Sequence, residues 1–164
     1  MATPPAAGTE HLAIARGLNL PVSTKHCLEL SRELRYKTTS YAKKYLEEVM
    51  EIRRAVPFRR FTRNVGHKRG MASGRFPQKA AKEMLYLIKS VEANAQVKGL
   101  NTSNLKITKL IANRAATPMT GSRRPHGKKR THLEVEVRER KMPAKESVPG
   151  SAKVKMPKKE VVTP

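Results

Sequence analysis

The longest regular segment of the chain covers residues 74–100 and reads GRFPQKAAKEMLYLIKSVEANAQVKGL. Its apolar residues recur at intervals of three and four, the spacing of one face of an α-helix, at Ala81, Met84, Ile88, Val91 and Ala95. Pro77 is typical of the first position of a helix, and Gly99 is typical of the residue that ends one. The spacing therefore predicts an amphipathic helix over about residues 77–98.

Two shorter helices are predicted before this segment. Ser23 is a favoured N-cap residue, and the apolar residues after it recur at helical spacing, which indicates a helix over about 23–35. Residues 38–40 offer a second cap, which begins a predicted helix over about 39–53. The apolar face of this helix comprises Ala42, Tyr45, Leu46, Val49 and Ile52. A weak alternation from His11 to Leu18 indicates a short strand that ends near Gly17.

A pair of strands is predicted after the long helix. Leu105 and Ile107 alternate with polar residues, and Leu110 is out of phase with them, which indicates a bulge within a strand. Residues 132–138 alternate without interruption, with Leu133, Val135 and Val137 expected to face inward and Glu134, Glu136 and Arg138 outward. The connection, about 113–130, is far longer than a tight hairpin needs, so we expect its tip to project from the domain.

The predicted fold is therefore α+β, with three helices packed on a small antiparallel sheet and a long protruding β-hairpin over 105–138. We expect one domain over residues 11–140 that includes a long basic loop over 53–76. Residues 1–10 and 141–164 lack any periodic pattern, and we expect both to be disordered tails.

The charge of the chain indicates an anionic partner. Lys and Arg number 35 against 13 acids, all of which are Glu, and the formal net charge is +22. Such a charge destabilises a compact protein through self-repulsion unless a partner neutralises it, and nucleic acid is the obvious candidate. A single basic run is usually a solvated surface, but here two acid-free runs, 53–76 and 93–133, flank one helix and favour an RNA surface.

Candidate RNA contacts come from both runs. Those in and just after the first run are Arg53, Arg54, Arg59, Arg60, Arg63, His67, Lys68, Arg69, Arg75 and Lys79. Those in the second run are Arg114, Arg123, Arg124, Lys128, Lys129 and Arg130. Arginine dominates the first run, and its planar guanidinium can bind phosphate oxygens in pairs or stack on a splayed base.

The aromatic residues divide into two groups. Tyr45 and Tyr86 lie in predicted helices, and we expect both in the core. Phe58 and Phe61, in the sequence PFRRFTR, leave two alternatives open: they anchor the basic loop, or they stack on bases.

Several function classes are disfavoured by the residue inventory. Cys27 is the single cysteine and His26 is its neighbour, but adjacent helical residues point apart, so we expect no metal site. Asp is absent and there is no phosphate-binding glycine loop or catalytic triad, so we expect no enzyme, no cofactor and no small-molecule substrate. No apolar run is long enough to span a bilayer and the first residues lack a secretion signal, so we expect a cytoplasmic protein without a membrane partner.

The order of motifs resembles a known family. The motifs are PVSTKH, KKYLEEV, AVPFRRF, VGHKRG, the 74–100 segment and RRPHGKK. Over about residues 12–139 the chain closely resembles large-subunit ribosomal protein twenty-two in bacterial naming, the counterpart of protein seventeen in eukaryotes. AVPFRRF and VGHKRG correspond to an insertion of archaeal and eukaryotic members, so the resemblance is to that branch and most of all to archaeal proteins.

The resemblance implies a structural and assembly function. The expected partners are large-subunit rRNA of the 23S type, neighbouring large-subunit proteins and, transiently, the nascent polypeptide. The matching positions imply rRNA contacts at Ser23, Thr24, Lys25, Asn94, Arg124, His126, Gly127 and Lys128, while Pro125 departs from the family pattern. The hairpin of the family lines the polypeptide exit tunnel, which assigns the uncharged residues of the tip to the tunnel wall: Thr117, Pro118, Met119, Thr120, Gly121 and Ser122. Without the resemblance, a flexible turn would be the preferred interpretation of these six residues.

Two other hypotheses lack their expected signatures. The charge of +22 would serve equally well for a basic protein that packages or regulates DNA, but we find no helix pair with a turn-sized connection that leads to a recognition helix. An RNA-modifying enzyme would need a catalytic constellation that the residue inventory lacks.

Overall fold

The structure is a computed structural model, and it describes residues 11–121, 123 and 126–140. Both predicted tails lie outside the described residues, as do Ser122, Arg124 and Pro125 in the hairpin.

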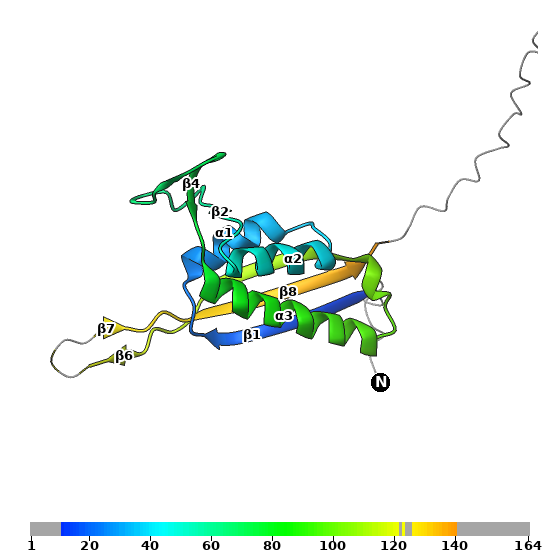
Figure 1. The fold of residues 1–164 in the computed structure, drawn as a ribbon. Coiled ribbons are helices and arrows are strands. Elements are labelled where there is room, and N and C mark those ends of the chain that lie inside the picture. The colour runs from blue at the N-terminus through cyan, green and yellow to red at the C-terminus, as the bar shows by residue number, and fades with distance from the viewer. Residues whose placement is uncertain (1–10, 122, 124–125, 141–164) are drawn as a thin grey trace, which may run out of the picture.

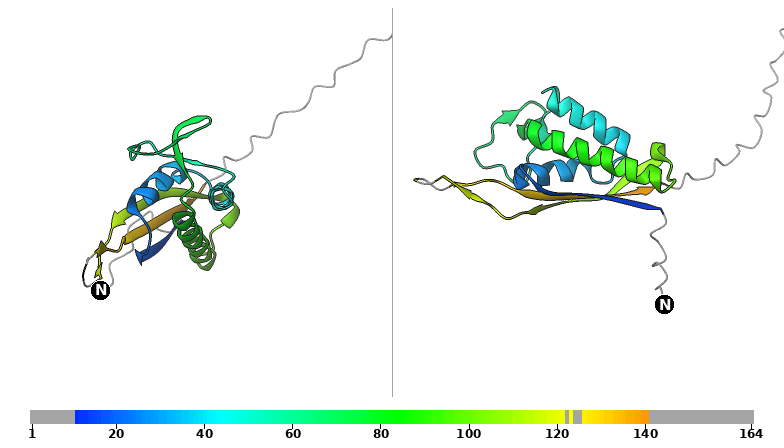
Figure 2. Two further views of the ribbon diagram at one scale, coloured as in Figure 1. Left: turned by 60° about the vertical axis from the view of Figure 1, so that its left-hand side comes forward. Right: turned by 90° about the horizontal axis from the view of Figure 1, so that it is seen from below.

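A three-stranded antiparallel sheet forms one layer of the domain and the helices form the other. The strands β1 (Leu12–Leu20), β8 (Thr131–Glu139) and β5 (Leu105–Arg114) lie in the order β1-β8-β5. The helices α1 (Thr24–Leu34), α2 (Thr39–Met50) and α3 (Gln78–Val97) cover one face of this sheet, and the other face carries none of the described helices (Figures 1 and 2). A 3₁₀ turn, η1 (Thr102–Asn104), leads from α3 into β5. The α+β prediction is confirmed.

The core lies between the two layers. All five stripe residues of α3 are inaccessible to solvent, and so are Ile107, Leu110, Val135 and Val137 on the facing side of the sheet. The predicted bulge in β5 is confirmed, because the register with β8 shifts between Ile107 and Lys109. The extra residue returns Leu110 to the buried face, which explains why its position is out of phase in the sequence.

Two predicted core residues are on the surface. Tyr86 is 74% exposed because it lies two positions from both Met84 and Ile88, about 200° around the helix from the face that they bury. Ile52 is 56% exposed because α2 ends at Met50 and Ile52 adopts a φ of 63°, outside the helical region. Tyr45, by contrast, is buried as predicted.

One residue predicted to face outward is nevertheless buried. Glu136 alternates with Val135 and Val137, so it lies on the side of the sheet opposite the helices, but it is only 5% exposed. Lys109 Nζ lies 2.8 Å and Arg138 Nη2 3.3 Å from its carboxylate oxygens, and the Thr108 hydroxyl donates to it. These partners lower the pKa of Glu136 against the opposing effect of burial.

The basic segment over 53–76 is more regular than the loop that we predicted. It contains β2 (Val56–Pro57), β3 (His67–Lys68) and β4 (Met71–Arg75), which form a second sheet in the order β2-β4-β3. This small sheet extends beyond the helical layer (Figure 1). Its strands are only two to five residues long, which explains why no alternation is visible in the sequence.

The hairpin projects from one end of the main sheet, as predicted (Figure 1). Beyond β5 and β8, its two arms pair again through β6 (Met119–Thr120) and β7 (His126–Gly127). The small sheet, the hairpin and the starts of α1 and α3 consequently lie at the same end of the domain (Figures 1 and 2).

Candidate nucleic-acid interface

Three adjoining cavities open where these elements meet. We call the largest, of about 580 Å³, the stem cavity; it is lined by Pro21, Val22, Ser23, His26, Phe76, Pro77, Gln78, Lys79, Ala80, Lys128, Lys129 and Arg130. A second, of about 370 Å³, is bordered by Lys25 and by Arg60, Arg63 and Arg75 of the basic segment. A third, of about 430 Å³, includes Thr24, Arg114 and Gly127. Ser23 and Lys129 line all three, so the cavities form one continuous cationic surface.

The start of α1 is held against the hairpin stem by a short chain of hydroxyl groups. Thr24 Oγ1 lies 2.8 Å from Thr131 Oγ1, and the Thr131 hydroxyl donates to the Val22 carbonyl at 3.0 Å. The hydroxyl of Thr24 therefore has a structural partner within the protein. Ser23, the N-cap, makes no capping hydrogen bond with its side chain, and the first turn of α1 has no acid. The helix start is left electropositive toward the cavities.

A buried carboxylate fixes the backbone of the basic segment. Glu29 of α1 is 2% exposed, and its oxygens accept hydrogen bonds from the backbone N–H groups of Arg59, Arg60 and Phe61 at 3.2, 2.9 and 3.0 Å. The chain at PFRRF is thereby held with Arg59 and Arg60 exposed. Glu29 was not among the residues predicted from the sequence. The only feature that marks it there is its position directly beside Leu30, which belongs to the apolar stripe of α1.

The two phenylalanines of this segment have different environments. Phe58 is 3% exposed and belongs to the core, so it anchors the segment. Phe61 is half-buried against the core, and the cations of Lys25 and Arg60 lie 5.4 and 5.5 Å from the centre of its ring. The side chain of Phe61 is thus in contact with two of the predicted RNA-binding cations.

His26 lines the stem cavity, and its surroundings lower its pKa. Burial lowers the pKa of His26, and the nearby charges of Arg75 and Lys129 lower it further. The edge of its ring packs against Phe58, with the centres 5.6 Å apart and the planes at 83°. The imidazole is therefore neutral near pH 7 and can both donate and accept a hydrogen bond.

Most of the predicted contacts converge on this surface. The cavities are lined by Ser23, Thr24, Lys25, Arg60, Arg63, Arg75, Lys79, Arg114, Gly127, Lys128, Lys129 and Arg130. Gly127 permits a close approach of the hairpin arms, because a Cβ atom there would lie 2.5 Å from Cγ2 of Thr117.

Other predicted contacts lie outside the three cavities. Arg53 and Arg54 form ion pairs with Glu51 and Glu48 at 2.9 and 3.2 Å, next to the end of α2. Asn94 donates to the Ile14 carbonyl at 2.9 Å and so ties α3 to β1.

The remaining predicted contacts are on the outer parts of the small sheet and the hairpin. Lys68 and Arg69 are exposed, His67 Nδ1 lies 2.9 Å from the Ala72 carbonyl oxygen, and Arg59 lies 3.7 Å from Glu33. Arg123 and His126 are exposed in the hairpin, and Arg124 lies outside the described residues.

The predicted tunnel-lining residues lie in the projecting hairpin. Thr117, Pro118, Met119 and Gly121 are exposed, Thr120 is partly exposed, and Ser122 lies outside the described residues. The side chain of Thr120 donates to the His126 carbonyl across the hairpin at 3.2 Å.

The described residues provide neither a reactive thiol nor a cluster of metal ligands. Cys27 is fully buried, and burial raises its pKa to about 12, so the thiol is unreactive near pH 7. Residues 11–121, 123 and 126–140 contain no cluster of three potential metal ligands. None of the helices in those ranges has the length and apolar character that crossing a bilayer requires.

The chain is similar to known proteins over most of its length. The profile of the family described as Ribosomal protein L22p/L17e matches residues 15–137. A large ribosomal subunit protein uL22 from Ignicoccus hospitalis is 42% identical over 142 residues, which are 79% of this chain and 89% of that protein. The protein of the same name from Methanoculleus marisnigri is 46% identical over 107 residues, 63% of this chain and 70% of that protein. That from Methanocella arvoryzae is 49% identical over 98 residues, 58% of this chain and 64% of that protein.

Proposed function

The chain belongs to the ribosomal protein L22p/L17e family, and from this membership we propose that it is a structural component of the large ribosomal subunit that binds and organises large-subunit rRNA. Its relatives from three archaea are named large ribosomal subunit proteins. The protein acts in the cytoplasmic ribosome and is not an enzyme.

The observation that carries the proposal is the convergence of cations from distant parts of the sequence. Lys25, Arg60, Arg75, Lys79 and Lys129 come from five separate elements or connections, and all border cavities that share Ser23. The described residues that line these cavities include no acid. A surface with several cations and no acid repels itself, and contact with phosphate groups replaces that repulsion with attraction.

The hairpin supports a second part of the proposal, a position along the wall of the polypeptide exit tunnel. Arg114 and Lys128–Arg130 supply cations at its stem, whereas residues 117–121 are uncharged. A charged stem suits a fixed contact with phosphate groups. An uncharged arm suits a wall along which nascent chains must slide, whereas Arg123 adds a cation at the turn between β6 and β7.

The DNA-binding alternative meets a specific objection. A turn-sized connection, residues 35–38, does join α1 and α2. The second helix of this pair is unsuited to recognition, because Ala42, Tyr45 and Val49 bury one of its faces and Glu47 and Glu48 lie outside it. Carboxylates on an exposed recognition helix would repel the phosphates on both sides of a groove.

Sedimentation tests the proposal. Tagged full-length protein, expressed in its host, is expected to remain with large subunits in a sucrose gradient at high salt. A predominantly free or DNA-associated pool would contradict the proposal.

A matched variant, Lys129→Glu, reverses a charge that all three cavities share, and it is expected to shift protein from subunits to the top of the gradient. Lys44→Glu, on the exposed side of α2, is the control and is expected to sediment as the unmodified protein does.

A further inference from the structure

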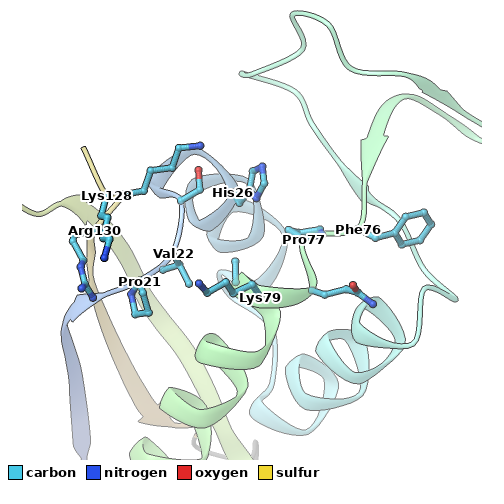
Figure 3. A pocket seen from close by; sticks show the side chains of 12 residues that line it. Pro21, Val22, His26, Phe76, Pro77, Lys79, Lys128 and Arg130 are labelled. Atoms are coloured by element: carbon cyan, nitrogen blue, oxygen red, sulfur yellow. The ribbon is translucent and has the colours of Figure 1, made fainter. Parts of the chain in front are cut away.

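The stem cavity differs from a simple phosphate-binding surface because it combines an apolar wall with a cationic rim. Pro21 and Val22 precede α1, and Pro77 and Ala80 begin α3, so two rigid chain segments supply the wall. Figure 3 shows Pro21, Val22 and Pro77 beside the pocket, which Lys79 borders from α3 and which Lys128 and Arg130 border from the hairpin stem. Phosphate groups gain nothing from an apolar wall, whereas the face of a nucleobase does.

The size of the cavity and its polar groups also suit one nucleotide. A volume of about 580 Å³ is in the range of pockets that enclose a single small ligand. His26 presents an imidazole that burial and two neighbouring cations keep neutral, so it can pair with donor or acceptor groups on the edge of a base. Its ring is held in place by edge contact with Phe58.

The cations of the rim have unused capacity for an anion. Arg130 Nη1 donates to the Asn19 carbonyl at 3.1 Å, which orients the guanidinium, while its buried Nε atom has no acceptor among the described residues. Lys79 and Lys129 are exposed at the same cavity. A phosphate group at this rim would face the charges of Lys79, Lys129 and Arg130 together.

We propose that the stem cavity receives a single unstacked nucleotide of the large-subunit rRNA, with its base against Val22 and Pro77 and its phosphate group on Lys79, Lys129 and Arg130. This inference rests on the proposed function. The proposed surface contacts mainly the RNA backbone. The stem cavity adds one specific site, at which an unpaired base contributes to binding. Sequence-specific recognition of RNA by proteins commonly uses such extruded bases.

An abasic scan tests the proposal with the full-length protein. Each unpaired nucleotide of the bound rRNA fragment is replaced in turn by an abasic residue, which keeps the phosphate and removes the base. We expect one position at which affinity falls by roughly tenfold, in the range for loss of one stacked base. With the His26→Leu variant, the same abasic substitution should cost much less, because the site that held the base is already impaired. The His11→Leu variant, at the far end of β1, should retain the full loss.

The outcomes separate this inference from the proposed function. If the unmodified protein binds rRNA with a steep salt dependence but no abasic position weakens it, the cavity holds no base, and this inference fails alone. If an abasic loss occurs but His26→Leu and His11→Leu preserve it equally, the base lies elsewhere, and the inference also fails. Failure to bind the rRNA at all would overturn the proposed function together with the inference. Circular dichroism verifies that each variant is folded. The abasic scan with the unmodified protein does not depend on the folding of any variant.

Discussion

The carboxylate of Glu29 accepts a hydrogen bond from the backbone N–H of Arg60 at 2.9 Å, so one of the few acids in this chain holds one of its proposed RNA-binding arginines in place. The acid is buried and the arginine side chain is exposed. Because the bond uses the backbone of Arg60, the guanidinium remains available to a partner. The negative charge is buried, and the chain geometry that it stabilises presents positive charge at the surface.

Replacing Glu29 with Gln should destabilise the basic segment. An amide has one acceptor oxygen and turns an N–H₂ group toward backbone donors, so at least one of three buried N–H groups loses its partner. We expect a loss of roughly 1–3 kcal/mol in the free energy of unfolding, measured with urea. Hydrogen exchange should become faster at the amides of Arg59, Arg60 and Phe61.

Glu33→Gln is the control, because Glu33 contacts the side chain of Arg59 at 3.7 Å and is partly exposed. Loss of a surface ion pair should change stability by less than about 1 kcal/mol. Equal effects of the two substitutions would show that the buried hydrogen bonds of Glu29 do not hold the segment.

The ion-paired arginines should contribute less to RNA binding than the unpaired ones. Arg60 and Arg63 border the second cavity, whereas Arg53 and Arg54 already have glutamate partners. Changing Arg60 and Arg63 to Ala should reduce the slope of log affinity against log salt by a little under about one unit for each residue. The matched Arg53→Ala, Arg54→Ala double variant should change the slope by less, and an equal or larger change would contradict this ranking.

Gly127 should tolerate substitution by alanine only if the side chain of Thr117 is also made smaller. A Cβ atom at Gly127 would meet the methyl group of Thr117 at 2.5 Å, so Gly127→Ala should separate the hairpin arms. The amide of Lys128, which donates to the Pro118 carbonyl at 2.9 Å, should then exchange faster with solvent. Thr117→Ser removes that methyl group and should restore protection in the double variant. Persistent fast exchange in the double variant would mean that the methyl contact is not the cause.

Assembly and tunnel functions should separate along the hairpin. Deletion of residues 117–122 removes only uncharged residues, so we expect normal yields of large subunits but altered pausing of nascent chains, measured by ribosome profiling. Neutralising Arg114, Lys128, Lys129 and Arg130 should instead lower the subunit yield. Unchanged translation of every tunnel-sensitive sequence by fully assembled tip-deleted ribosomes would refute the tunnel assignment and leave the stem as an rRNA contact.

Cys27 should be inert until the protein unfolds. Its thiol is fully buried and burial raises its pKa to about 12, so little thiolate is present at pH 8. Alkylation by iodoacetamide should be at least about a hundredfold slower in the folded protein than in urea. Rapid alkylation without denaturant would show that α1 separates readily from the core.

The three helices, the β5 bulge and the projecting hairpin were all predictable from the sequence. Each depends on the spacing of apolar residues within one segment, and a helix or strand with one buried face imposes that spacing locally. The charge runs predict an RNA surface, which remains a proposal. The sequence was a poorer guide at Tyr86, where apolar character alone suggested burial, and the exposed side of α3 contradicts it.

The candidate site itself depends on contacts between segments that are distant in the chain. Glu29 meets Arg60 across 31 positions, and Thr24 meets Thr131 across 107. No local pattern records such pairs, so the sequence could not distinguish a buried, bond-accepting Glu29 from a solvated one. It also could not separate the ion-paired Arg53 from the cavity-lining Arg63. Apolar periodicity is a property of one segment and can be read directly from the sequence. A cavity, by contrast, exists only where several folded segments meet.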